Sequence, residues 1–473
     1  MTNAPIWQWS AVETAAAIRN DKVTSKEVVR AHLDRMHAAN PALNAVVVDL
    51  GASAMQAAKA ADETLAASKR GGSEVGPLHG VPVTIKINID VEGQANSNGV
   101  VAFKDNIAPG DSPVTANLKK AGAVIIGLTN TPEFSLRGFT DNPLHGLTRN
   151  PWNAEVTCGG SSGGAGASIA AGIGTIAHGN DIGGSLRWPA HCNGIATIKP
   201  TQGRIPAFNP SATAERPLMA QFMSSQGPLA RHVADVRLGL EVMAQRDPRD
   251  PWYVPAPLEG PARPKRAAIC LNPDGLATKP EVKAAVTDAG KRLERAGWTV
   301  EIIENTPPMR EAVEWQRKLW LGDAFEAQLE MAEREGDPGA LACLRGNRAK
   351  VTPMDQANYA QALTRRATLT RDWMLFFEKY AVVLTPVSGE LPFPDHLDVK
   401  DADSFARVWE AQMPQIATPF MGLPGLVVST GLVGKAPVGV QIVSGRYRED
   451  LCLLAGEAIE AGGVPPSPID PVG

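Results

Sequence analysis

The sequence has few of the residues that build disulfide frameworks and metal centres. Its 473 residues include five cysteines, an odd number scattered along the chain: Cys158, Cys192, Cys270, Cys343 and Cys452. This pattern argues against a disulfide framework and favours a reducing compartment. Neither a CxxC nor an HExxH motif occurs, so the sequence predicts no metal site.

Long apolar runs and an excess of positive charge are also missing. No stretch approaches the ~18 uninterrupted apolar residues of a membrane-spanning helix. The N-terminal segment lacks the charged and apolar blocks of a secretory signal. The formal net charge is −4, from 46 basic and 50 acidic residues. We therefore expect a cytoplasmic protein that binds neither nucleic acid nor a membrane surface.

The composition that remains, 44% hydrophobic and 20% charged, is that of a globular protein with a large core. Apolar periodicity predicts helices at 24–39, 52–68, 112–121, 280–296, 309–335, 355–379 and 449–461. Alternating or continuous apolar runs predict strands at 79–93, 123–128, 266–270, 298–303, 381–386, 425–430 and 437–443. The alternation of the two kinds of element indicates the α/β class.

One lysine stands in an unusual place. Most lysines are solvated, but Lys86 lies inside the apolar string "VTIKINI" of the first predicted strand. Burial disfavours the charged form of an amine, so a buried lysine gives up its proton more easily. Such a lysine can serve as a general base.

Two glycine-rich strings each contain a serine that could react. "CGGSSGGAGASIAAG", residues 158–172, includes Ser161, and "GNDIGGSLRWPA", residues 179–190, places Ser185 behind two glycines. Backbone N–H groups exposed around a hydroxyl suit a serine nucleophile, which still needs a base. The first string lacks GxxxxGK[ST], which disfavours a nucleotide-binding loop and leaves a close-packed structural loop as the alternative.

The order Lys86, Ser161, Ser185 resembles the amidase signature family of serine hydrolases. Matching strings extend the resemblance to about residues 10–465: "HGVPVTIK", "GAVIIGLTNTPEF", "RNPWN", "NGIATIKPTQGRIP", "GLPGLVVSTGL" and "PVGVQIV". The resemblance implies one α/β domain, residues 1–473, with a mixed, twisted sheet covered by helices on both faces. Core motifs would occupy about 75–210, a mostly helical variable segment about 305–380, and closing strands and a helix about 381–465.

The same resemblance implies a Ser–Ser–Lys triad that hydrolyses a carboxamide or anilide through an acyl-serine. Ser185 would be the nucleophile, Lys86 the base, and Ser161, after a cis peptide bond, the relay between them. The oxyanion hole would consist of the N–H groups of Ile182, Gly183, Gly184 and Ser185. No cofactor is implied, and the partners are a small-molecule amide and water, with a homodimer left open.

Three positions depart from the family pattern without removing a triad member: Ile87, Asn180 and Cys158. The family resemblance points to Ser135 and to the variable segment for substrate selection. The aromatic residues of that segment, including Trp315, Trp320 and Phe325, favour an apolar or aromatic substrate. The alternative is that these aromatic side chains only pack the helices together.

Other functions stay open at this point. A histidine base such as His178 or His191, or a nucleophilic Cys158 or Cys192, would replace the triad. The same triad could act on a carbamate, ester or hydrazide. The chain could also be the glutaminase component of a tRNA-dependent amidotransferase, or a catalytically silent scaffold protein.

Overall fold

A mixed sheet of 11 strands runs through the computed structural model, which describes residues 4–322, 325–352 and 354–472. The strand order is β1-β3-β2-β4-β6-β5-β10-β11-β9-β7-β8. The strands are β1 Val46–Asp49, β2 Pro82–Lys86, β3 Val124–Thr129, β4 Ile176–Asp181, β5 Ala196–Lys199, β6 Ser225–Ala230, β7 Arg266–Ile269, β8 Thr299–Ile302, β9 Val382–Pro386, β10 Gly425–Val433 and β11 Ala436–Val443.

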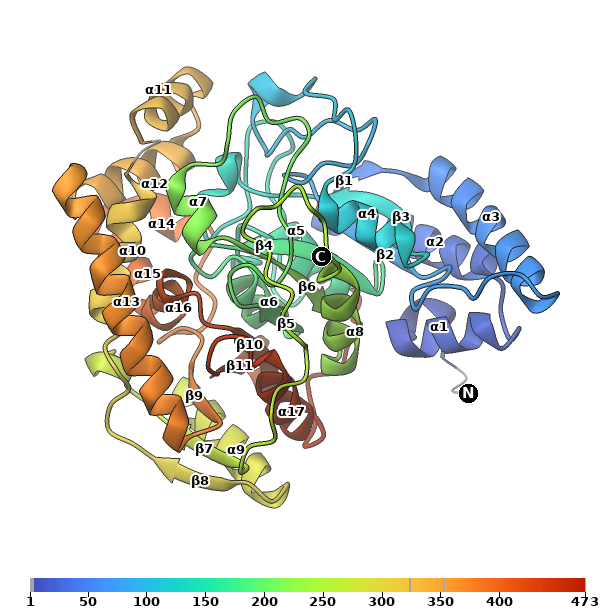
Figure 1. Ribbon diagram of the computed structural model, residues 1–473. Coiled ribbons are helices and arrows are strands. Elements are labelled where there is room, and N and C mark those ends of the chain that lie inside the picture. Colours follow the sequence, from blue (N-terminus) through green and yellow to red (C-terminus); the bar gives the residue numbers. More distant parts are fainter. Residues whose placement is uncertain (1–3, 323–324, 353, 473) are drawn as a thin grey trace.

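Helices cover both faces of this sheet, as the family resemblance implied. Those of the first half are α1 Ala11–Arg19, α2 Ser25–Leu43, α3 Gly51–Lys69, α4 Pro113–Lys120, α5 Gly163–Ala170, α6 Arg187–Asn193, α7 Leu218–Met223 and α8 Val233–Met243. The rest are α9 Pro280–Arg295, α10 Arg310–Trp320, α11 Phe325–Glu335, α12 Pro338–Arg348, α13 Gln356–Lys379, α14 Leu397–Lys400, α15 Ala402–Ala411, α16 Met413–Met421 and α17 Glu449–Glu460. Helices α10 and α13 lie on the opposite side of the molecule from α1–α3 (Figure 1).

The predicted alternation of strands and helices is seen in β2, α4 and β3, which form a β–α–β unit because β2 and β3 pair in parallel. The strand predicted over 79–93 is shorter than expected and ends at Lys86. There the Ile87 N–H donates to the Thr129 carbonyl, and the Ile89 N–H donates back to the Lys86 carbonyl. This turn ends the pairing, although the alternation of apolar residues continues past it.

The single helix predicted over 309–335 is two helices in the structure, because α10 ends at Trp320 and α11 begins at Phe325. Gly322 follows the end of α10, and glycine inside a helix costs about 1 kcal/mol relative to alanine. Positions 323 and 324 lie outside the described residues. Helices α14–α16 were not predicted from the sequence, and in α16 the prolines Pro414 and Pro419 hide the helical pattern.

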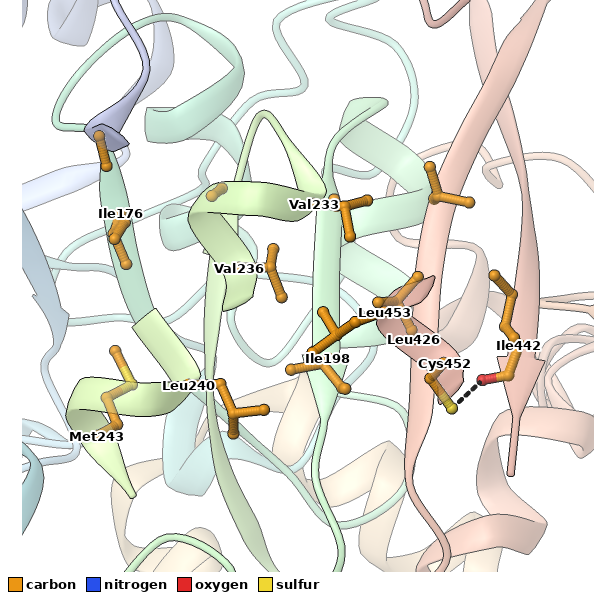
Figure 2. Close-up of a cluster of buried hydrophobic side chains, with 14 of the residues drawn as sticks. Ile176, Ile198, Val233, Val236, Leu240, Met243, Leu426, Ile442, Cys452 and Leu453 are labelled. Atoms are coloured by element: carbon orange, nitrogen blue, oxygen red, sulfur yellow. Dashed lines mark hydrogen bonds between the residues drawn. The ribbon is translucent and has the colours of Figure 1, made fainter. Parts of the chain in front are cut away.

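A large apolar cluster holds the central strands from one face. Figure 2 shows α8 and α17 packed over β4, β5, β10 and β11. Ile176, Ile198, Leu426 and Ile442 from the strands are almost fully buried there. Burying each such side chain contributes roughly 1.5–3 kcal/mol. The cluster therefore fixes β4, the strand that leads directly into the second glycine-rich string.

Small residues pack the other glycine-rich string against its neighbours. A Cβ added to Gly164 of α5 would lie 2.4 Å from the Asn130 backbone nitrogen, closer than atoms can approach. Ala165 and Ile169 of the same helix are fully buried in a second apolar cluster. The first glycine-rich string, residues 158–172, is therefore a close-packed loop followed by α5, and β4 comes next in the chain.

Candidate active site

Lys86, Ser161 and Asn180 meet at the ends of β2 and β4. Lys86 is the last residue of β2 and is completely buried. Its Nζ lies 2.6 Å from Ser161 Oγ and 2.8 Å from Asn180 Oδ1. The Gly160–Ser161 peptide bond is cis. The structure thus joins two of the three residues singled out from the sequence, and it adds Asn180, which the sequence marked only as a departure from the family.

Burial sets the protonation state of Lys86. It lowers the pKa of the ammonium well below its usual range, and the negative charge of Asp181 offsets only part of this shift. A neutral amine has two N–H groups and one lone pair. Asn180 Oδ1 can accept one N–H, while the lone pair can accept the hydroxyl proton of Ser161. The arrangement can therefore remove a proton from Ser161.

A buried ion pair fixes the loop that carries Ser185. Asp181 Oδ1 accepts from the Gly184 N–H at 2.8 Å, and Oδ2 accepts from the Leu186 N–H at 3.1 Å. Arg187 donates to both oxygens of the same carboxylate. Its guanidinium also donates to Thr418 Oγ1, Gln441 Oε1 and the Gln415 carbonyl. Burial alone would raise the pKa of Asp181, but Arg187 holds it below its usual value.

This loop leaves several backbone N–H groups without a partner. Within the described part of the chain, the N–H groups of Ile182, Gly183 and Ser185 donate to no acceptor. Unpaired N–H groups next to a hydroxyl can bind a developing oxyanion. The prediction of four oxyanion donors is corrected to three, because the Gly184 N–H already donates to Asp181 Oδ1.

Ser185 is partly exposed and faces a small cavity of about 40 Å³. Gly183 lines the same cavity, together with three rings that we call the aromatic wall: Trp320, Phe405 and Trp409. The ring centroids of Trp320 and Trp409 are 5.7 Å apart, and those of Phe405 and Trp409 are 5.9 Å apart. An apolar group can therefore be held next to the Ser185 hydroxyl.

Of the three aromatic residues predicted to bind substrate, Trp320 reaches this cavity. Trp315 packs instead in a separate core cluster, and its Nε1 donates to Glu311 Oε1 at 3.3 Å. Phe325 is buried below the Arg348 guanidinium, which lies 5.1 Å from the ring centroid. Neither of these two residues lines the cavity. This arrangement favours the packing alternative for both residues, and their contact with substrate stays a prediction.

Ser135, in the short 3₁₀ helix Glu133–Ser135, contributes to a polar network rather than to the cavity wall. Its Oγ accepts from Asn88 Nδ2 at 3.0 Å and donates to Asn98 Oδ1 at 2.7 Å. Asn88 Oδ1 in turn accepts from Asn180 Nδ2 at 3.0 Å. This contact leaves the Asn180 carbonyl oxygen facing Lys86. Asn88 therefore supports the site, a role that the sequence did not predict.

Two residues of the aromatic wall were also missed. Phe405 and Trp409 lie four positions apart on α15, a spacing that places both on one face of a helix. The spacing in the sequence is therefore a signal for this pair, but only once residues 402–411 are known to form a helix.

The alternative bases and nucleophiles, His178, His191, Cys158 and Cys192, are all buried. Burial lowers the pKa of His178 to about 3 and that of His191 to about 4. His178 bonds to Gln226 Oε1 at 2.8 Å, and His191 stacks on Trp188. Burial raises the pKa of the Cys158 and Cys192 thiols, which disfavours thiolates. In the described ranges, no group of three or more His, Cys, Asp or Glu residues is arranged to bind a metal ion.

Comparison with known proteins adds to this geometry. The family model described as Amidase matches residues 27–453. The indoleacetamide hydrolase of Bradyrhizobium diazoefficiens is 56% identical over 467 residues, which cover 96% of this chain and 87% of that protein. The acylamidase of Rhodococcus erythropolis is 32% identical over 483 residues, which cover 98% of this chain and 97% of that protein. The crystal structure of a bacterial aryl acylamidase from the amidase signature family superimposes with a TM-score of 0.82 at 26% identity, covering 97% of both chains.

Proposed function

We propose that this amide hydrolase, a member of the amidase family, acts on indoleacetamide or a closely similar arylacetamide and releases the carboxylate and ammonia. The chain belongs to that family because the family model covers most of its length. The observation that carries the proposal is the position of the partly exposed Ser185, which lies between unpaired N–H groups and the aromatic wall. The relative with 56% identity supports an indole-bearing substrate.

In the first chemical step, Ser185 Oγ bonds to the amide carbonyl carbon. The Ser185 proton passes to Ser161 Oγ as the Ser161 proton passes to the neutral amine of Lys86. The π electrons of the carbonyl move to its oxygen, and the free N–H groups of Ile182, Gly183 and Ser185 stabilise the resulting charge. The 2.6 Å contact between Lys86 and Ser161 supports this relay.

The tetrahedral intermediate then loses its nitrogen. The C–N bond breaks, and the proton held by Lys86 returns through Ser161 to the departing nitrogen, which leaves as ammonia. Water attacks the acyl-serine by the same relay, releasing the carboxylate and restoring the Ser185 hydroxyl. The buried pair of Asp181 and Arg187 holds the loop in place throughout.

The aromatic wall supports an aryl group on the acyl side. The cavity of about 40 Å³ has room for only a few water molecules. We infer that the wall moves to admit an aryl group. Trp409 is partly exposed and packs between Trp320 and Phe405, which makes it the ring best placed to move.

A glutaminase function is less well supported by the cavity. Free glutamine carries an ammonium and a carboxylate that a binding site must pair. The charged side chains among the described lining residues are Arg137 and Asp398, and they pair with each other. Arg137 Nε donates to Asp398 Oδ2 and Arg137 Nη2 donates to Asp398 Oδ1, both at 2.8 Å, and the pair is buried. Neither charge is free for an amino acid substrate.

Two finer expectations accompany the proposal. A cytoplasmic location is consistent with five cysteines that are all free and buried. Among the described residues, no helix combines the length and the apolarity needed to cross a bilayer. Homodimer formation stays a prediction, which sedimentation of the purified protein would check.

The test is a substrate panel on the purified protein: indoleacetamide, phenylacetamide, acetamide, glutamine, malonamide, an anilide, an arylacetate ester, a carbamate and a hydrazide. We expect the highest kcat/KM for the two arylacetamides. A preference for glutamine or malonamide would overturn the proposal. A preference for the ester, carbamate or hydrazide would be consistent with the triad chemistry but would overturn the proposed arylacetamide substrate.

A further inference from the structure

We propose that Gln316 positions the Gly183 N–H as an oxyanion donor, and that helix α10 thereby couples the aromatic wall to the hydrolysis step. This inference rests on the proposed function, because it assigns a role within the same acyl transfer. Gln316 would be a positioning residue, since it contacts the loop and not the reacting atoms.

Among the described residues, the Gln316 side chain makes one hydrogen bond, and it is with the loop that carries Ser185. The side chain is completely buried in α10, and its Nε2 donates to the Ile182 carbonyl at 3.0 Å. A carbonyl oxygen can only accept, so the NH₂ end of the glutamine must face it. The contact bridges the variable helical segment and the end of β4, which are far apart in sequence.

The Ile182 carbonyl and the Gly183 N–H belong to one peptide group. A peptide group is planar, and a trans peptide points its C=O and N–H in opposite directions. Fixing the carbonyl therefore fixes the direction of the Gly183 N–H, one of the groups without an acceptor. Glycine needs such help, because it rotates more freely than any other residue.

Helix α10 also covers this peptide with a ring. A Cβ added to Gly183 would lie 3.3 Å from a ring carbon of Trp320 and 3.4 Å from Gln316 Nε2. Gln316 and Trp320 are four positions apart and so share one helix face. Movement of Trp320 by a bound aryl group would therefore act on the same peptide that Gln316 holds.

Packing alone does not require a glutamine at this position. In the described structure, Gln316 Oε1 has no hydrogen-bond partner although it is buried. A buried, unpaired acceptor destabilises the folded state. Methionine has a similar length and could fill this space without that defect. The donor to Ile182 is thus the feature that only the amide supplies.

The test compares Gln316→Met with a matched control, Gln202→Met. Gln202 is also buried and donates Nε2 to a backbone carbonyl, that of Gln221, at 3.0 Å. For Gln316→Met we expect kcat on the best arylacetamide to fall about 10- to 100-fold, less than the loss of a whole oxyanion donor. KM should change less than about threefold, and Gln202→Met should keep the wild-type kcat.

Inhibitor binding separates positioning from a structural defect. An arylmethyl trifluoromethyl ketone, which forms a tetrahedral adduct with the nucleophile, should bind Gln316→Met more weakly by the same factor as kcat/KM falls. An arylacetate, which forms no adduct, should bind both proteins equally. If Gln316→Met does not fold, Gln316→Glu replaces it. A glutamic acid can donate only while protonated, so its kcat relative to wild type should fall as the pH rises.

Wild-type kcat in Gln316→Met would overturn the inference. Equal weakening of ketone and arylacetate binding would also overturn it. So would a ratio of Gln316→Glu kcat to wild-type kcat that does not change with pH. Failure of the proposed function looks different: Ser185→Ala would then remain active, or the panel would favour glutamine. A dead Ser185→Ala protein together with a fully active Gln316→Met protein would reject the inference alone.

Discussion

Two regions of the molecule meet at Gly183, and they are built from opposite kinds of residue. The glycine-rich centre, residues 158–187, brings backbone against backbone. A Cβ on Gly160 would lie 2.5 Å from the Arg137 carbonyl oxygen. The aromatic wall, Trp320, Phe405 and Trp409, comes from helices whose other faces are exposed to solvent.

The two regions differ because their tasks differ. Proton transfer and oxyanion binding need donors and acceptors at hydrogen-bond distance, which small residues allow by letting main chains approach closely. Recognition of an aryl group needs apolar area, which large rings supply. Substitutions in the centre should therefore abolish the reaction, whereas substitutions in the wall should change which substrate is accepted.

The largest effect should come from Ser185→Ala. Removing the nucleophile should lower kcat by at least about 10³-fold on every substrate. The folded state should survive, because Ser185 is partly exposed and its side chain fills little core volume. The matched control is Ser168→Ala in the first glycine-rich string, whose buried Oγ donates locally to the Ala165 carbonyl. Labelling by a fluorophosphonate at any residue other than Ser185 would contradict the assignment.

Lys86→Met should rank next, with a kcat loss of about 10²- to 10⁴-fold. In the wild type, the rate should rise with pH as Lys86 loses its proton, because a neutral amine is needed. Lys199→Met is the control, since Lys199 is equally buried, with a pKa lowered to about 7, and lies in β5. It should keep the rising limb of the pH profile. A flat profile in wild type, or a rising limb in Lys86→Met, would make Lys86 structural.

The same variant tests the stability cost of the buried lysine. The pKa of Lys86 is lower in the folded than in the unfolded protein, so below the unfolded value near ~10.4 the unfolded chain binds an extra proton. The lysine therefore destabilises the folded state at neutral pH, and less so as the pH rises. Thermal melts should show that Lys86→Met gains stability relative to wild type near neutral pH and loses that gain toward pH ~10. A stability difference independent of pH would contradict a lowered pKa.

Trp320→Ala should have a smaller and selective effect. We expect kcat/KM for an arylacetamide to fall about 10- to 100-fold, while acetamide turnover changes little, because the ring supplies apolar contact only to the larger substrate. Trp315→Ala is the control on the same helix. It should lower the melting temperature and leave the ratio of the two substrates unchanged. Equal losses on both substrates in Trp320→Ala would remove the distinction between wall and centre.

Thiol reagents should have the smallest effect. All five cysteines are free and buried, and burial raises the pKa of each thiol, to about 12 for Cys343. Reagents that attack thiolates should therefore leave the folded enzyme active. The measurement is residual activity and mass after treatment of native protein. Rapid inactivation together with a mass increase of one alkyl group would contradict this prediction and indicate that a reactive cysteine takes part in catalysis.

The sequence predicted the centre better than the wall, for a physical reason. Short motifs such as "GNDIGGSLR" fold through local contacts, like those from the Asp181 carboxylate to the Gly184 N–H and the Arg187 guanidinium. The wall is assembled from α10 and α15, and its members touch only after the whole chain has folded. Trp315 and Trp320 show the difficulty, since five positions turn a helix by about 140° and send the two rings to different places.

The sequence alone determined the α/β class, the order Lys86, Ser161 and Ser185, and the burial of a lysine within an apolar strand. Local features of the sequence indicate each of these: the alternation of apolar residues, the spacing of glycines and the residue types. Only the tertiary structure decided that Asn180 rather than Asp181 meets the Lys86 amine, that Asp181 occupies the Gly184 N–H, and that Gln316 reaches Ile182. Such contacts depend on angles and distances of a few ångströms between distant segments, which no spacing along a chain specifies.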